Sequence, residues 1–139
     1  MATKTRTWSY EFTGATNAHQ FDARTLGIAG GETHGNCALR LEVDVLSTNF
    51  GGSALQVLWS KSLHHVLLEV DGTPSVNIDD TVLDSGGFDN SANPETAPTV
   101  AVTSVSGSTL SIDVASGGPT DRRCVVDVKA RVLERGEVE

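Results

Sequence analysis

The chain has 139 residues, which is enough for one domain with its own hydrophobic core. It holds 18 acidic and 10 basic residues, for a formal net charge of −8. An acidic surface repels a phosphate backbone, so this balance argues against nucleic acid as a partner. No stretch approaches the roughly 18 apolar residues of a membrane-spanning helix, and the first residues lack the apolar core of a secretory signal. We therefore expect a protein made in a cytoplasm, with no membrane partner.

Two stretches alternate strongly between apolar and polar residues, which is the pattern of a strand with one buried face. In 36–46 the apolar set is Cys37, Leu39, Leu41, Val43 and Val45. In 123–134 it is Cys124, Val126, Val128, Ala130 and Val132. We predict that these two stretches are the long central strands of the fold.

The N-terminal third is uneven in its signals. Residues 5–12 alternate with Trp8, Tyr10 and Phe12 on one side, which predicts a first strand anchored in the core. Segment 13–35 is rich in glycine, and only a short helical turn is suggested, around 17–24. Its glycines do not follow the G-x-x-x-x-G-K-[ST] order of a phosphate-binding loop.

The middle of the chain suggests shorter elements. We expect a strand over 54–60, a tight connection at 61–62, a strand over 63–71 and a short strand over 75–82. We predict a long loop over residues 83–98. Because such loops are often functional, this loop is the first candidate for a contact surface.

The remaining C-terminal signals are clearer. Residues 99–105 and 109–114 predict a hairpin around a Ser-Gly-Ser turn. In total we expect seven or eight strands and no long helix. The predicted fold is all-β, a single-domain antiparallel sandwich or barrel of Greek-key or jelly-roll type over 1–139. Residues 1–4 are expected to form a flexible arm and 135–139 a frayed tail.

Catalytic motifs are absent from the sequence. His64 and His65 are adjacent on an expected strand, so they point to opposite faces and cannot easily share a metal ion. There is no H-x-x-x-H, C-x-x-C or G-x-S-x-G pattern. We expect no catalytic residue, no cofactor and no enzymatic activity.

Two ligand classes stay open as alternatives. Oxygen-bearing side chains near the long loop could bind calcium, although their order does not match an EF-hand and such residues also favour turns. These candidates are Asp79, Asp80, Asp84, Asp89 and Asn90. Trp59 and Phe88 are candidates for a platform on which a carbohydrate stacks.

The two cysteines, Cys37 and Cys124, both fall on the expected inner face of a strand. Free cysteine behaves as a small core hydrophobe, so separate buried thiols are the favoured interpretation. A disulfide between Cys37 and Cys124 stays open if the two strands are neighbours.

Several features of the whole chain together resemble small virion proteins of tailed phages. They are a short basic start with Lys4 and Arg6, an acidic β domain rich in Ser, Thr and Gly turns, and a long last strand of the type C-V-V-D-V-K-A-R-V-L-E. The resemblance is to capsid decoration, or cement, proteins. It implies a protein without an active site that binds the major capsid protein or other virion subunits at the capsid surface.

The same resemblance implies a homo-oligomer, most simply a trimer. The residues expected to contact partners are Lys4 and Arg6 in the short basic start and Asp84, Phe88, Asp89 and Asn93 in the long loop. The alternatives are another phage structural role, in the neck, tail tube or tail terminator, or a calcium- or carbohydrate-binding β-sandwich.

Overall fold

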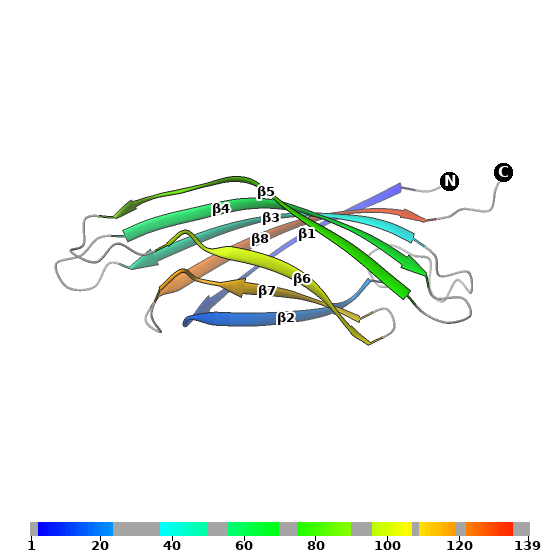
Figure 1. Cartoon of the computed structure of the whole chain (residues 1–139), viewed down its shortest axis with the longest axis horizontal. Coiled ribbons are helices and arrows are strands. Elements are labelled where there is room, and N and C mark those ends of the chain that lie inside the picture. Colours follow the sequence, from blue (N-terminus) through cyan, green and yellow to red (C-terminus); the bar gives the residue numbers. More distant parts are fainter. Residues whose placement is uncertain are drawn as a thin grey trace.

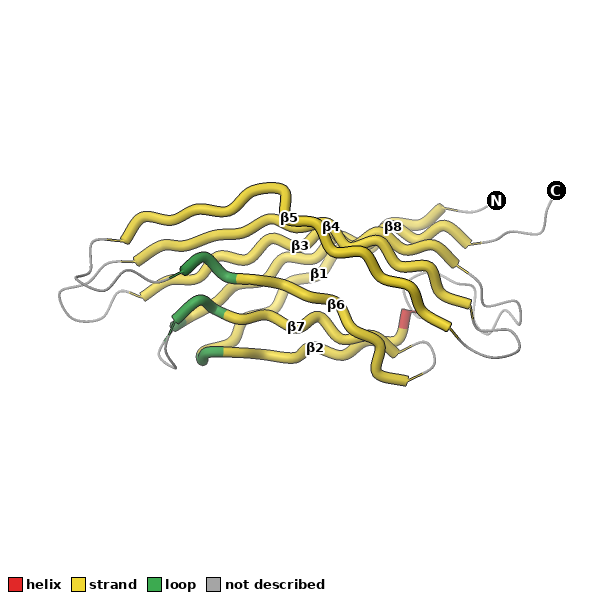
Figure 2. The backbone as a smooth tube through the Cα atoms, viewed as in Figure 1, coloured by secondary structure: helices red, strands yellow, loops and turns green. Residues whose placement is uncertain are grey.

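The computed structural model describes residues 3–23, 37–49, 56–69, 75–89, 96–106, 109–118 and 122–134. These residues form eight strands: β1 (Thr3–Thr13), β2 (Thr16–Asp22), β3 (Cys37–Asn49), β4 (Gln56–Glu69), β5 (Ser75–Asp89), β6 (Thr99–Ser106), β7 (Thr109–Ala115) and β8 (Arg123–Glu134). Figure 2 shows how little of this described backbone is not strand. In the described part of the chain, no helix is long and apolar enough to span a membrane.

The strands form two antiparallel sheets. One has five strands in the order β1-β8-β3-β4-β5, and the other has three in the order β2-β7-β6. The smaller sheet lies against one face of the larger one (Figure 1), and buried side chains from both sheets form a single core cluster. The predicted all-β sandwich is confirmed.

The pairing of β3 with β8 lies at the centre of the larger sheet. Their register joins Leu41 to Ala130, Val43 to Val128 and Val45 to Val126. All six of these side chains are at most 2% exposed. Full burial of an aliphatic side chain stabilises a fold by about 1.5–3 kcal/mol, so this double row contributes a large share of the core energy. The two stretches predicted as central strands are therefore neighbours.

An aromatic cluster between the two sheets joins the first predicted strand to a segment that the sequence predicted wrongly. Tyr10 of β1 stacks on His19 of β2 with ring centroids 4.3 Å apart, and Trp8 meets Phe21 edge-on at 5.6 Å. The helical turn expected around 17–24 is wrong, because residues 16–22 form strand β2. Asn17, His19 and Phe21 alternate inward, and the two polar members hide the period-2 pattern.

Strand β4 corrects a second expectation. The connection expected at 61–62 does not exist, because β4 runs unbroken from Gln56 to Glu69. Ser60, Ser62 and His64 continue the inward-facing positions and are at most 5% exposed. Small polar residues in these buried positions interrupted the apolar alternation on which the prediction depended.

Strand β5 contradicts a third prediction. It extends to Asp89, so the first part of the loop expected at 83–98 is an edge strand. Lys61 pairs with Asp84 and Ser62 with Val82, which makes Leu83 the extra residue of a β-bulge. Bulges are common on sheet edges, where they interrupt pairing with other chains.

Two glycines of β5 read as turn residues in the sequence but serve packing in the structure. A Cβ added to Gly86 would come within 2.8 Å of the Trp59 ring, and one added to Gly87 would meet Cδ2 of Leu58. Both glycines thus allow β4 side chains to lie directly against the β5 backbone. This close approach is one reason for glycine inside a strand.

The register excludes the disulfide that the sequence left open. Cys37 pairs with Glu134, whereas Cys124 pairs with Ser47, ten residues further along β3. At about 3.3 Å per residue the two cysteines are roughly 33 Å apart. Cys124 is a free, buried thiol, and burial is the main cause that raises its pKa. The hydrogen bond with Ser47 and the charge of Arg122 act in the opposite direction.

Tyr10 gives a pH-dependent test of the aromatic cluster. Burial, with smaller contributions from Asp113 and Cys124, raises the pKa of Tyr10 from 10.0 to about 12. A raised pKa means that the folded state holds the phenol proton more tightly than the unfolded chain. The stabilisation is complete below pH 10 and is lost as the pH rises towards 12.

We expect the tyrosinate absorbance of the folded protein to have its midpoint near pH 12, and urea-unfolded protein to have it near pH 10. Tyr10 is the only tyrosine, so the signal has one source. A folded-state midpoint near pH 10 would show that the ring is open to solvent.

Candidate functional site

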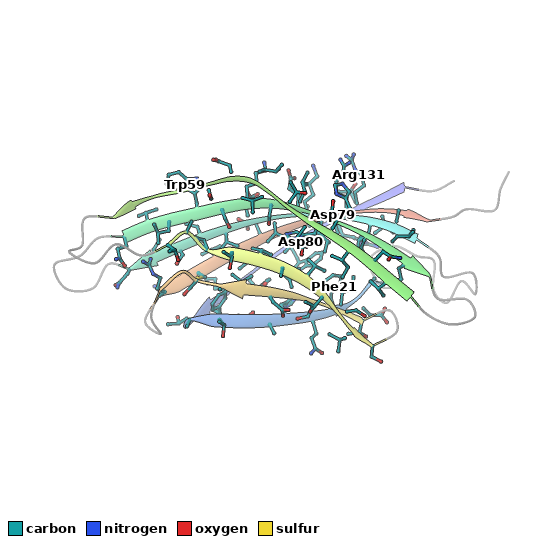
Figure 3. The ribbon with its side chains drawn as sticks, viewed as in Figure 1. Phe21, Trp59, Asp79, Asp80 and Arg131 are labelled. Atoms are coloured by element: carbon teal, nitrogen blue, oxygen red, sulfur yellow. The ribbon has the colours of Figure 1, made fainter. Side chains whose placement is uncertain are left out.

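The face of the five-stranded sheet that points away from β2, β7 and β6 is the candidate binding surface, called here the outer face. Antiparallel register arranges its side chains in rows across the strands, about 7 Å apart. Three rows are defined by their residues from β8, β3 and β4: the basic row is Arg131, Arg40 and His65, the middle row is Lys129, Glu42 and Leu63, and the acidic row is Asp127, Asp44 and Lys61. Figure 3 shows Arg131 and Trp59 on the far side of the large sheet from Phe21 of β2.

The basic row brings two guanidinium groups together. Arg40 and Arg131 are directly opposite on β3 and β8. Arg40 donates from Nε to Nε2 of His65 over 3.1 Å, so in this arrangement the His65 ring is an acceptor there. Like charges directly opposite on a sheet are destabilising. The row borders a hollow of about 490 Å³ whose lining also includes Ala38, Leu67 and Asp79.

The acidic row repeats this arrangement with the opposite sign. Asp44 lies opposite Asp127 on one side and Lys61 on the other. Partial burial is the main cause that raises the pKa of Asp44; Lys61 lowers it, and Glu42 and Asp127 raise it further. Lys61 also lies 3.3 Å from Glu42, measured from Nζ to Oε1. The fold thus keeps the carboxylates of Asp44 and Asp127 side by side, although neither group stabilises the other.

Exposed apolar side chains flank these charged rows at both ends. Beyond the acidic row, Leu46 is 43% and Trp59 40% exposed, and the Trp59 ring lies close to Gly86. Beyond the basic row, Leu67 is 49% exposed. Large apolar side chains grouped on a polar surface are typical of contact surfaces.

A second polar constellation lies on the inner side of the same sheet and was missed in the sequence. Oγ of Ser62 is 2.7 Å from Nε2 of His64, and Nδ1 of His64 is 2.5 Å from Oδ1 of Asp80. With the ring proton on Nδ1, His64 donates to Asp80 and accepts from Ser62. The signal was the S-x-H spacing, which puts both side chains on one strand face.

The Ser–His–Asp order of these side chains matches a serine hydrolase triad, but here the serine is buried and the aspartate is the exposed member. Ser62 and His64 are 2% and 0% exposed, whereas the Asp80 side chain is 39% exposed. A nucleophile must come within about 3 Å of a substrate carbonyl, and here the hydroxyl is the most enclosed end. The arrangement is suited to tying edge strand β5 to β4 through the core.

The calcium candidates do not converge on one point. Asp79 pairs with His65 and lies on the outer face, whereas Asp80 pairs with His64 on the other side of the sheet, where its side chain is 39% exposed. Asp84 follows the bulge. The described residues contain no group of three or more His, Cys, Asp or Glu side chains that could hold a metal ion. Asn90 and the side chain of Asp89 lie outside the described part of the structure.

The residues predicted to contact a partner also lie far apart in the structure. Arg6 is exposed on β1 and Asp84 on β5, and these are the two opposite edge strands of the sheet. Lys4 belongs to β1, so strand begins within the expected arm. Asp89 ends β5, while Asn93 and the side chains of Lys4 and Phe88 lie outside what the structure describes. Of the two residues expected to form a carbohydrate platform, Trp59 is the one whose side chain the structure describes, and it lies on the outer face.

The inner constellation predicts a specific loss of stability. In Asp80→Ala, Nδ1 of the buried His64 loses its acceptor, and a buried donor without a partner costs about 1–3 kcal/mol. The matched control is Asp79→Ala, which removes a carboxylate from the next residue on the outer face and should stay within about 0.5 kcal/mol. Urea denaturation of both variants measures the difference, and equal losses would show that the His64 contact does not stabilise the fold.

Comparison with known proteins gives a likeness of fold. No family model and no curated protein matches the sequence. Among solved structures, the tailspike protein of Acinetobacter baumannii phage AM24 matches 96% of this chain with a TM-score of 0.53 and 11% identity. The tailspike protein of Acinetobacter phage vB_ApiP_P1 matches 90% of the chain with a TM-score of 0.36 and 17% identity. This chain spans 27% and 20% of the lengths of those two chains. The match to the phage AM24 protein shows that the fold of this chain is similar to a part of that tailspike.

Proposed function

We propose that the chain is a structural module of a phage virion and that it belongs to the tail rather than to the capsid surface. The observation that carries the proposal is the likeness of fold to part of the phage AM24 tailspike protein over 96% of this chain. That likeness favours a tail-associated role over the capsid decoration that the sequence suggested. The virion assignment agrees with the resemblance of the whole sequence to phage structural proteins.

The proposed mode of action is surface contact, without catalysis. The outer face offers what a docking surface needs, because rows of fixed charge are flanked by exposed Leu46, Trp59 and Leu67. Charged groups of this kind set the register and the choice of partner, and the apolar groups supply the contact energy. The enclosed Ser62 hydroxyl supports the same view, since it offers no access to a substrate.

Localisation on the virus particle tests the proposal. We expect gold-labelled antibodies against this chain to mark the tails of purified particles in electron micrographs. Particles grown without the gene are the control for antibody specificity. Label over the head surface would replace the tail role with decoration, and absence of the chain from purified particles would overturn the virion assignment itself.

A further inference from the structure

The hollow that the basic row borders, called here the basic hollow, combines positive charge with apolar surface. Its volume is about 490 Å³, which is within the range of small-molecule pockets. Arg40 of β3 and Arg131 of β8 are opposite each other on its lining, which also includes Ala38 and Leu67. Leu67 is 49% exposed, so its apolar surface is open to a ligand. The basic hollow can therefore contact a charged group and an apolar group of one molecule.

Both guanidinium groups of this hollow have donors to spare. Arg40 donates from Nε to Nε2 of His65 over 3.1 Å. Among the residues that the structure describes, no other side-chain hydrogen bond involves Arg40, none involves Arg131, and neither arginine forms an ion pair. Like charges opposite each other on neighbouring strands cost stability. An anion that accepts from both groups removes this cost.

The charges of all five strands around the basic hollow leave an excess of one positive charge. From β1 to β5 the row through the hollow is Thr5, Arg131, Arg40, His65 and Asp79. The His65 ring accepts at Nε2 and is neutral, so two guanidinium groups stand against one carboxylate. In the middle row, Lys129 and Glu42 have opposite charges. A singly charged anion matches this balance, whereas a phosphate dianion exceeds it.

We propose that the basic hollow binds a single carboxylate that is carried on a short apolar chain. Guanidinium groups bind carboxylates through charge-assisted hydrogen bonds. Arg40 and Arg131 lie on adjacent strands, about 5 Å apart, so both can reach one carboxylate. Ala38 and Leu67 contact the apolar chain. His65 is a positioning residue, because its hydrogen bond with Nε of Arg40 orients that guanidinium group.

Asp79 gives the bound ligand a direction. It lies opposite His65 on β5, two strand spacings or about 10 Å from Arg40. Its negative charge repels a carboxylate from the β5 side of the basic hollow. The carboxylate therefore binds over β3 and β8, and the apolar chain extends over β4, where Leu67 lies.

Titration of the ¹⁵N-labelled chain with sodium butyrate, followed by nuclear magnetic resonance at low ionic strength, tests the site. We expect saturable shifts of the backbone amides that line the hollow, at 38–40, 65–67 and 77–79. Acetate should bind about tenfold more weakly, because it lacks two CH₂ groups that the hollow buries. Propylammonium, which has the same chain and the opposite charge, should cause no such shifts. Inorganic phosphate should bind more weakly than butyrate.

Substitutions assign the binding to named residues. Arg40→Gln and Arg131→Gln each remove one guanidinium group and should weaken butyrate binding about tenfold. Lys129→Gln is the matched control, because it removes the same charge from β8 one row away, and it should change the affinity at most about twofold. Leu67→Ser should reduce the preference for butyrate over acetate. Asp79→Asn should bind butyrate more tightly, since it removes a repelling charge.

A carboxylate on a short apolar chain has two natural sources, a free carboxylic acid and a glutamate side chain of another protein. Capped glutamate, N-acetylglutamate amide, separates them in the same titration. Tighter binding of this probe than of butyrate would identify a protein side chain as the source, because the hollow would then also accept the peptide groups. Weaker binding would identify a free acid.

Four results would overturn the proposal: no saturable shifts with butyrate, equal affinity in the arginine variants and the unchanged chain, equal weakening by Lys129→Gln, or tighter binding of phosphate than of butyrate. The same spectra show whether each variant is folded. If an arginine variant does not fold, Asp79→Asn decides, because an affinity that it fails to raise would also count against the site. The test is independent of the tail role, since it uses the purified chain alone.

Discussion

The register between β3 and β8 is the constraint on which both faces of the larger sheet depend. It brings Val43 against Val128 on the inner side, and β1 and β4 then extend the sheet outward from these two strands. A slip of one residue would turn the whole inner set towards solvent. The same register determines the outer face, because Arg40 can lie opposite Arg131 only where Val43 lies opposite Val128. Core packing and surface chemistry are thus two consequences of one alignment.

Buried polar side chains add a second level of constraint at the ends and edges of the sandwich. Arg122 is fully buried and donates from Nη2 to Oε1 of Gln56 over 2.6 Å, which joins the start of β8 to the start of β4. The contact of His64 with Asp80 joins β4 to edge strand β5. A buried polar group is costly without its partner, so each of these bonds penalises alternative registers more strongly than an apolar contact would. The His64–Asp80 contact therefore helps to hold edge strand β5 in a single register despite its bulge at Leu83.

The parts of the fold that could be predicted from sequence are those in which local pattern and burial agree. Strands β3, β8 and the hairpin of β6 and β7 have apolar residues at their inward positions, and they were placed within a few residues. Strand β2, the middle of β4 and the second half of β5 were not, because His19, Ser62 and Gly86 have inward or close-packed roles that their residue types do not announce. The outer face was beyond local reasoning for another reason. Its rows join residues about 90 positions apart, such as Arg40 and Arg131, and become visible only once strand order and register are known.

The arrangement of charge on the outer face is more demanding than solubility requires. A solvent-exposed sheet surface is most stable when unlike charges oppose each other on neighbouring strands. Exchanging Arg131 with Asp127 would achieve this across β3 and β8 with no change in composition or core packing. The chain instead pairs Arg40 with Arg131 and Asp44 with Asp127 across β3 and β8, at a cost in stability, and it pairs unlike charges there only between Glu42 and Lys129. Strand β4 offsets part of that cost, because Lys61 lies opposite Asp44 and His65 accepts a hydrogen bond from Arg40, so three strands rather than two determine how stable this surface is.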